Sequence, residues 1–248
     1  VNLGGTFDLS SIDGTVGRVN HTGGALNING TLNMGGGTLD VGTGMLGTAG
    51  LTAINSPGVV SNGTLTNTGG GTLAINNGTL AGMTVAAPVT VTSTNLVDVV
   101  GDLTLAAGAT LTTGANVRFV NGTTLTPHAL GGSGTLALTN GGGLYTNAST
   151  DIINIGSLTT VTATGSTSFS YWSSQGTINN AGAVLVGSGG TLSVSNIRYG
   201  NSGTMVVSGT GTLTLATAGG APNWVNSGTI AQSGGVVNLG GIFDLASI

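Results

Sequence analysis

The chain of 248 residues contains no cysteine, no lysine and no glutamate, and charged residues make up only 4% of it. An ordinary soluble domain has roughly 25% charged residues. The lack of cysteine excludes disulfides, thiolate metal sites and a cysteine nucleophile. Three arginines and a formal net charge of −4 argue against nucleic acid as a partner, because binding it requires several basic side chains to neutralise phosphates.

Long helices and membrane spans are also missing from the pattern. Two strong helix formers, Glu and Lys, are absent, and each of the 49 glycines would destabilise a helix interior by about 1 kcal/mol. The most apolar stretches, such as Ala81–Val91, are far shorter than the roughly 20 apolar residues that cross a bilayer. Disorder is disfavoured because 39% of the residues are hydrophobic and the net charge is small. We therefore expect a folded, all-β chain without a membrane span.

What the sequence has in abundance is a short repeat, Gly-Thr followed by an aliphatic or aromatic residue. It starts at Gly5, Gly14, Gly30, Gly37, Gly63, Gly71, Gly78, Gly134, Gly176, Gly190, Gly203, Gly211 and Gly228. Apolar and small polar residues then alternate, which predicts strands of about four to six residues. Asn-Gly pairs precede several of these strands and predict corners, because both residues tolerate positive φ.

Asn-Gly pairs also suit two-residue hairpins, so an antiparallel sandwich is the alternative fold. The spacing favours a solenoid. Gly63, Gly71 and Gly78 follow one another at short intervals, which fits successive short sides of one coil. A longer unit, an aromatic residue followed four positions later by Gly-Thr, recurs at nearly equal spacing, starting at Trp172, Tyr199 and Trp224. We predict a right-handed parallel β-solenoid of roughly ten to twelve coils, with Thr, Ser and Asn stacked in register.

The two ends of the sequence repeat one another. Residues 1–12 reappear at 237–248 with two positions changed, at an offset of 236. We therefore interpret residues 1–248 as one continuous solenoid segment, about one 236-residue period of a longer tandem array plus a 12-residue overlap. Segments of this kind stack on one another, so the expected partner is a neighbouring repeat or subunit.

Several phrases resemble the tandem repeats of giant bacterial secreted and surface proteins, namely Thr22–Leu32, Trp224–Ile230 and Val237–Gly241. Gly209–Leu215 is similar to autotransporter-associated β-strand repeats. This resemblance implies an exported β-helical stalk that carries adhesion or builds surface fibres, located outside the cell or on the bacterial surface. It brings no catalytic motif and no cofactor.

One group of charged residues is a candidate for chemistry. Asp98 and Asp102 are four positions apart and would share a face of an extended strand, with Arg118 about one coil further on. Parallel β-helix polysaccharide lyases combine acidic Ca²⁺ sites with a basic residue, so a lyase or hydrolase is one interpretation. The other is a surface Asp pair beside a turn, with Arg118 in solvent or in one salt bridge. Calcium-binding solenoids need an Asp in every turn, which seven scattered Asp cannot supply.

His21 lies near Asp13, Ser10 and Ser11 in the sequence, which are the residue types of a nucleophilic triad. No Gly-x-Ser-x-Gly elbow surrounds these serines, so we expect no triad. We likewise expect no catalytic residue, no metal site and no cofactor.

Aromatic residues gather in the last third of the chain. An exposed row of aromatic side chains could stack on the sugars of cell-surface glycans. The candidate residues for this contact are Tyr171, Trp172, Tyr199 and Trp224. Their fixed distance before Gly-Thr instead favours an interior ladder. The leading hypothesis is a non-enzymatic structural module, the stalk or body of a long surface protein or fibre. A glycan-binding adhesin module and, less favoured, a β-helix lyase are the alternatives.

Overall fold

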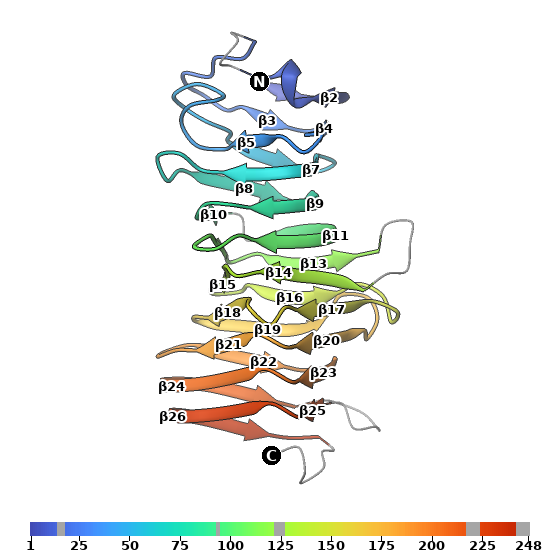
Figure 1. Ribbon diagram of the computed structural model, residues 1–248, viewed down its shortest axis with the longest axis vertical. Coiled ribbons are helices and arrows are strands. Elements are labelled where there is room, and N and C mark those ends of the chain that lie inside the picture. The colour runs from blue at the N-terminus through green and yellow to red at the C-terminus, as the bar shows by residue number, and fades with distance from the viewer. Residues whose placement is uncertain (14–17, 93–94, 122–126, 217–223, 242–248) are drawn as a thin grey trace.

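The computed structural model describes residues 1–13, 18–92, 95–121, 127–216 and 224–241. These residues form an elongated stack of short strands that runs from the N-terminal to the C-terminal coils (Figure 1). The stack is a parallel β-solenoid of about nine turns, slightly fewer than the predicted ten to twelve. The described part of the chain contains one helical element, the 3-10 turn η1 (Leu9–Ser11), and no helix long and apolar enough to cross a membrane.

The strands form three parallel ladders, one along each side of the solenoid. Ladder 1 consists of β1 (Asn2–Leu3), β3 (Asn27–Ile28), β6 (Ala53–Asn55), β8 (Thr72–Asn76), β10 (Val89–Val91), β12 (Thr110–Thr113), β15 (Thr135–Leu138), β18 (Thr160–Ala163), β21 (Ala183–Val186) and the first parts of β24 (Thr204–Leu215) and β26 (Thr229–Leu239). Ladder 2 consists of β2 (Thr6–Asp8), β4 (Thr31–Asn33), the first parts of β7 (Val59–Thr66), β9 (Gly78–Val85) and β11 (Leu96–Leu105), then β13 (Asn116–Val120), β16 (Gly143–Thr146), β19 (Ser166–Tyr171), β22 (Thr191–Val194) and the second parts of β24 and β26. Ladder 3 consists of β5 (Thr38–Asp40), the second parts of β7, β9 and β11, then β14 (His128–Gly132), β17 (Ile152–Ile155), β20 (Thr177–Asn180), β23 (Arg198–Asn201) and β25 (Trp224–Asn226).

Every pairing between these strands is parallel, which rules out the antiparallel sandwich. Coil length varies: the coil from Thr31 to its partner Val59 is much longer than the coil from Thr79 to its partner Asp98. The longer coils carry loops, such as residues 41–52 between β5 and β6. These loops lengthen single coils without adding turns to the stack.

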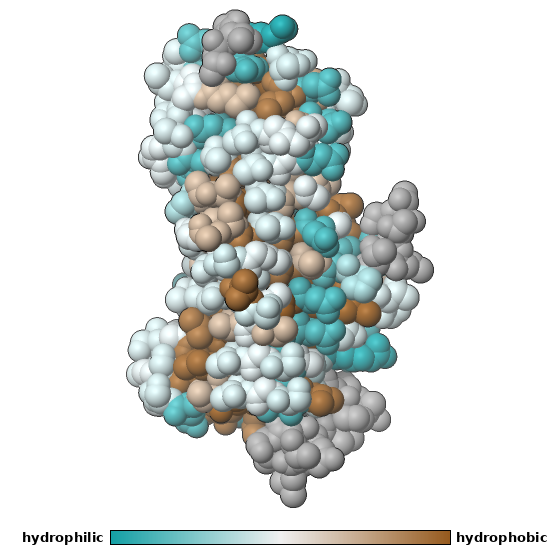
Figure 2. All heavy atoms as spheres, in the orientation of Figure 1, coloured by the Kyte–Doolittle hydropathy of each residue, from teal (hydrophilic) through white to brown (hydrophobic). Residues whose placement is uncertain are grey.

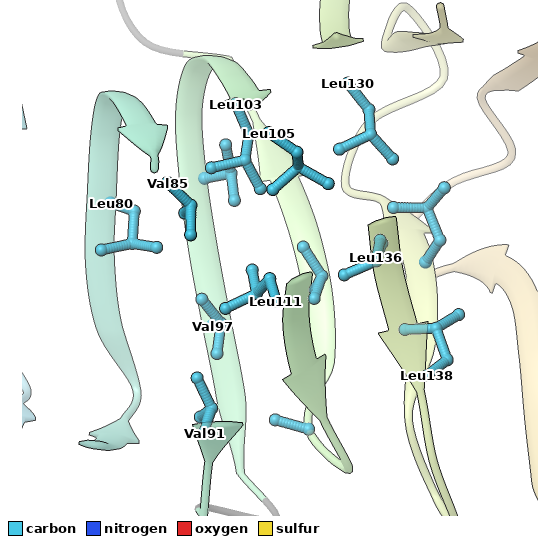
Figure 3. Packing of buried hydrophobic residues seen from close by; sticks show 14 of the residues in the cluster. Leu80, Val85, Val91, Val97, Leu103, Leu105, Leu111, Leu130, Leu136 and Leu138 are labelled. Atoms are coloured by element: carbon cyan, nitrogen blue, oxygen red, sulfur yellow. The ribbon is translucent and has the colours of Figure 1, made fainter. Parts of the chain in front are cut away.

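The interior is filled by one aliphatic residue above another. In β15, Leu136 and Leu138 are fully buried while the alanine between them faces outward, as the period-two pattern predicts. Leu136 lies in register between Leu111 and Val161 of the neighbouring coils. Figure 3 shows such side chains from successive coils pointing into one shared interior. Each buried Leu or Val contributes about 1.5–3 kcal/mol through removal of apolar surface from water.

The outer surface is mostly of intermediate hydropathy, with scattered hydrophobic and hydrophilic residues, as Figure 2 shows for one face. Two of the predicted Asn-Gly corners are confirmed, because Asn62 and Asn77 adopt left-handed φ values of 57° and 55°. The glycine of the Gly-Thr repeat has another role. A Cβ added to Gly203 would lie 2.1 Å from the carbonyl oxygen of Gly182 in the preceding coil, so glycine is required there by close approach of two backbones.

The longer repeat predicted from the aromatic residues needs one correction. Tyr199 and Trp224 do lie in register in ladder 3, one coil apart. The residue that stacks on Tyr199 from the preceding coil is Ile178, however, and Trp172 follows β19 in ladder 2. The equal spacing of the three aromatic residues before Gly-Thr wrongly predicts that Trp172 stacks on Tyr199 in ladder 3. The coil that ends at Tyr199 begins at Ile178, so it is shorter than the stretch of sequence from Trp172 to Tyr199.

Candidate functional site

The outward side chains of ladder 2 bring together residues that are distant in the sequence. Successive coils place Asp98 beside Arg118, Arg118 beside Tyr145, and Tyr145 beside Ser170. Arg118 forms a two-pronged ion pair with Asp98, in which Nε donates to Oδ1 at 2.7 Å and Nη2 donates to Oδ2 at 2.9 Å. Both side chains are only partly exposed, at 17% and 19%. This bidentate geometry fixes the plane of the guanidinium group.

Trp172 immediately follows β19 and packs on this row. The guanidinium carbon of Arg118 lies 5.2 Å from the centroid of its ring, within the range of a cation–π contact. The ring of Tyr145 meets it edge-on, with centroids 6.2 Å apart and an interplanar angle of 76°. The backbone N–H of Trp172 donates to the Thr146 carbonyl oxygen at 2.7 Å. The residue is nevertheless 49% exposed, so it is held in place and still accessible to solvent.

Tyr145 is positioned by a glycine two positions before it. A Cβ at Gly143 would lie 2.5 Å from Cε2 of Tyr145 and 2.9 Å from Oγ of Ser168, so the tyrosine ring occupies the space that a side chain at Gly143 would fill. The Tyr145 hydroxyl shares a hydrogen bond of 2.8 Å with Ser168 Oγ. We call Asp98, Arg118, Tyr145, Ser168 and Trp172 the Trp172 cluster.

The Trp172 cluster offers an aromatic surface edged by hydrogen-bonding groups. Arg118 uses two of its five N–H donors on Asp98 and, within the described residues, makes no other hydrogen bond. The indole N–H of Trp172 likewise has no acceptor in the described part of the chain. Such a surface can hold a flat or ring-shaped polar molecule by stacking and by hydrogen bonds.

The sequence predicts parts of this cluster but not the whole. It offers Asp98 and Arg118 as candidates for a lyase or hydrolase site and Trp172 as a candidate glycan contact. It does not indicate Tyr145 or Ser168. Arg118 and Tyr145 are in register although more residues separate Arg118 from Tyr145 than separate Asp98 from Arg118. A fixed coil length does not align them. The usable signal is an aromatic residue at an outward position between two buried ones in β16.

Asp102 does not join the cluster, and the prediction that it shares a face with Asp98 is wrong. Gly101 adopts a φ of 73°, and the strand register shifts between Val100 and Leu103, so the chain bends before Asp102. The Asp102 carboxylate instead accepts the backbone N–H of Ala129 at 2.7 Å. Both oxygens of Asp98 are bound by Arg118. In the described residues no group of three His, Cys, Asp or Glu side chains is placed to hold a metal ion.

The predicted aromatic contacts divide into two pairs. Tyr171 and Trp172 are 36% and 49% exposed, whereas Tyr199 and Trp224 are only 2% and 1% exposed. Tyr199 and Trp224 stack in the interior and offer no surface to a glycan. The prediction that these two residues could contact a glycan is therefore wrong. The Tyr199 hydroxyl donates to Met205 Sδ at 3.4 Å, and burial raises the pKa of this phenol above its usual value near 10.

His21 is also buried, and its Nδ1 lies 2.6 Å from the carbonyl oxygen of Gly50 in the loop between β5 and β6. The imidazole therefore ties that loop to the first coils. Asp13 and the serines before it precede residues 14–17, which lie outside the described part of the chain.

A second polar arrangement lies inside ladder 3. Asn180 Nδ2 donates to Asn201 Oδ1 at 2.8 Å, and Asn201 Nδ2 donates to Asn226 Oδ1 at 2.6 Å. Asn180 is fully buried and Asn201 is 3% exposed. Each of the three asparagines is followed two positions later by a glycine whose carbonyl accepts from the same amide, at 3.3–3.5 Å. The true repeat of these coils is therefore Asn-x-Gly, with amide stacked on amide and glycine on glycine.

Comparison with protein-family models, with curated proteins and with solved structures finds no match to this chain. The stacked ladders and the Trp172 cluster are therefore the features from which a function can be inferred.

Proposed function

We propose that the chain is a structural module that forms the stalk or body of a long bacterial surface protein or extracellular fibre. The observation that carries this proposal is the continuity of the three ladders. Ladders 1 and 2 run from β1 and β2 to β26 in register, and each coil is bonded to the coil before it and the coil after it. A protein whose coils contact only their neighbours gains length by adding coils, as repeat proteins do.

The stacked polar groups support the same function. Asn180, Asn201 and Asn226 accept and donate in turn, and a carboxylate or amine in their place would repel its own copy in the next coil. Close approach at glycines such as Gly203 and Gly228 fixes where one coil lies on another. Both features specify register along the axis, which is what a rod of repeated segments needs. The proposed partner is accordingly a neighbouring repeat or subunit, stacked end to end.

The proposed location is the bacterial surface or the extracellular space. It is supported by the resemblance of several repeats to exported proteins and by a composition without cysteine, whose folding does not depend on the redox state of a compartment.

Rod length tests this function. Chains with one, two and three tandem copies of the 236-residue period would be compared by negative-stain electron microscopy and small-angle scattering. Nine turns at about 4.8 Å per turn give about 43 Å for one segment, and each added copy should lengthen a straight rod by a similar amount. A matched control separates the copies with a Gly/Ser linker. Copies that appear as separate bodies at variable angles, as in this control, would contradict the proposal.

A further inference from the structure

We propose that the Trp172 cluster is a binding site for an uncharged pyranose ring of a glycan. This goes beyond the structural function, because a rod needs no exposed tryptophan on its side. Among the exposed large hydrophobic residues of the described chain, Trp172 is the one that other side chains hold in a defined orientation through aromatic and cationic contacts.

Trp172 is pre-organised for binding. A surface tryptophan normally loses rotamer freedom when it binds, and this loss weakens binding. Here Arg118 lies over the ring, Tyr145 meets its edge, and the backbone of Trp172 is bonded to Thr146, so the orientation is set before any ligand arrives. Half of the residue is still exposed. A pyranose has an apolar C–H face of about the size of an indole, and that face can stack on the accessible surface of Trp172.

Hydrogen-bonding groups surround the indole of Trp172. The rim of a pyranose carries hydroxyls that both donate and accept hydrogen bonds. The remaining N–H groups of Arg118 and the Trp172 Nε1–H supply donors without an acceptor in the described part of the chain, and the Tyr145–Ser168 hydroxyl pair can both donate and accept. An apolar surface with a few convergent polar groups is the usual composition of a small-ligand site.

The charge of the Trp172 cluster favours an uncharged sugar. Asp98 neutralises Arg118 with two hydrogen bonds, so the cluster as a whole carries no net charge. The chain itself has a formal net charge of −4, which does not attract an anionic polysaccharide. Acidic sugars would also have to compete with Asp98 for the guanidinium group.

The test is isothermal titration calorimetry of the folded chain with defined probes. The neutral probes are hexasaccharides of β-1,4-linked glucose, β-1,4-linked N-acetylglucosamine and α-1,6-linked mannose, and the acidic probe is oligogalacturonate of the same length. We expect at least one neutral probe to bind with a Kd of about 0.1–1 mM, the range of a single shallow site. Trp172→Ala should weaken this binding at least tenfold.

Two further variants make the result specific. Leu158→Ala removes another exposed hydrophobic residue, 73% exposed, at the bend between β17 and β18, and should bind as the native chain does. Tyr145→Phe keeps the ring and removes only the hydroxyl, so it should weaken binding about two- to fivefold. It also provides a test should Trp172→Ala fail to fold by circular dichroism.

Four results would overturn the inference. They are no binding of any neutral probe, binding of oligogalacturonate alone, equal binding by the native chain and Trp172→Ala, and a change of oligomeric state in Trp172→Ala with glycan binding unaltered. The last result would assign the cluster to contacts between copies. Rod length in tandem chains is measured separately, so failure of this site leaves the structural proposal unaffected, and the converse also holds.

Discussion

Replacing Gly203 by alanine tests whether close backbone approach is what the Gly-Thr repeat encodes. The new Cβ would lie 2.1 Å from the Gly182 oxygen and 2.5 Å from the Ala181 carbonyl carbon, whereas ordinary contacts are 3.4–4 Å. Both atoms belong to backbone, so the two coils must separate locally by more than about 1 Å, a large part of the inter-strand spacing of roughly 4.8 Å. Gly203 has no positive φ, so the effect would come from space alone.

The magnitude follows from the hydrogen bonds that hold the coils together at this point. Ser202 N donates to Asn180 O at 2.8 Å, Gly203 N donates to the same oxygen at 3.0 Å, and Thr204 N donates to Gly182 O at 2.9 Å. Loss of two of these bonds at about 0.5–1.5 kcal/mol each, together with looser packing below them, lowers the free energy of unfolding by about 2–4 kcal/mol. The loss should be local, because coils contact only their neighbours.

The assay is urea unfolding followed by far-ultraviolet circular dichroism, with amide hydrogen exchange to locate the effect. Gly187→Ala is the matched control, since an added Cβ there meets no atom within 4 Å and its φ is not strained. It should be neutral or stabilise by about 0.4–1 kcal/mol. If Gly203→Ala is as stable as Gly187→Ala, or if exchange of the Thr204 amide is unchanged, close approach is not the reason for this glycine.

Three more substitutions have defined outcomes. Asn201→Ala removes two hydrogen bonds of the buried amide ladder and should lower the free energy of unfolding by about 2–4 kcal/mol. The control Asn154→Ala loses one half-buried amide hydrogen bond of 3.0 Å and should lower it by about 1 kcal/mol or less. Equal losses for the two variants in urea unfolding would contradict the stabilising role of the ladder. Leu136→Ala opens a cavity in the interior and should cost about 2–5 kcal/mol by the same measurement, and a loss below about 1 kcal/mol would mean that the coils collapse around the gap. Tyr199 stays protonated in the fold while the unfolded chain ionises near pH 10, so stability is complete below that pH and then falls by up to about 1.4 kcal/mol per pH unit. Tyr199→Phe removes this contribution, and urea unfolding between pH 9 and 11.5 should show a shallower decline for it than for the native chain.

The architecture can be predicted from the sequence because the same physical rule applies at every coil. Alternation of Leu136 and Leu138 with small residues predicts strands, and Asn62 and Asn77 before glycine predict corners. What the sequence does not reveal is the length of each individual coil. Loops between strands make that length vary, and stacking depends on register in space. Sequence spacing therefore aligns Trp172 with Tyr199, although its true neighbours are Tyr145 and Arg118.

The candidate site depends on the same variable. Asp98, Arg118 and Tyr145 become one row only when the shorter interval from Asp98 to Arg118 and the longer interval from Arg118 to Tyr145 are both recognised as single coils. The wrong prediction that Asp102 shares a face with Asp98 has a local cause. The residues around Gly101 look like one continuous strand in the sequence, but the backbone bends at Gly101. The alternation of apolar and polar residues within a strand can be recognised from the sequence. Contacts between coils can be recognised only when the register of paired strands in successive coils is known.

The neutrality of the stacked amides has a consequence for the environment in which the solenoid is stable. Added salt acts on proteins largely by screening charges, and at 1 M ionic strength the screening length is only about 3 Å. The bonds between Asn180, Asn201 and Asn226, and the backbone bonds of the three ladders, join groups without net charge. Apart from the ion pair between Asp98 and Arg118, ionic strength therefore has little to screen along these coils, and we expect screening by salt to change the stability of the rod only slightly.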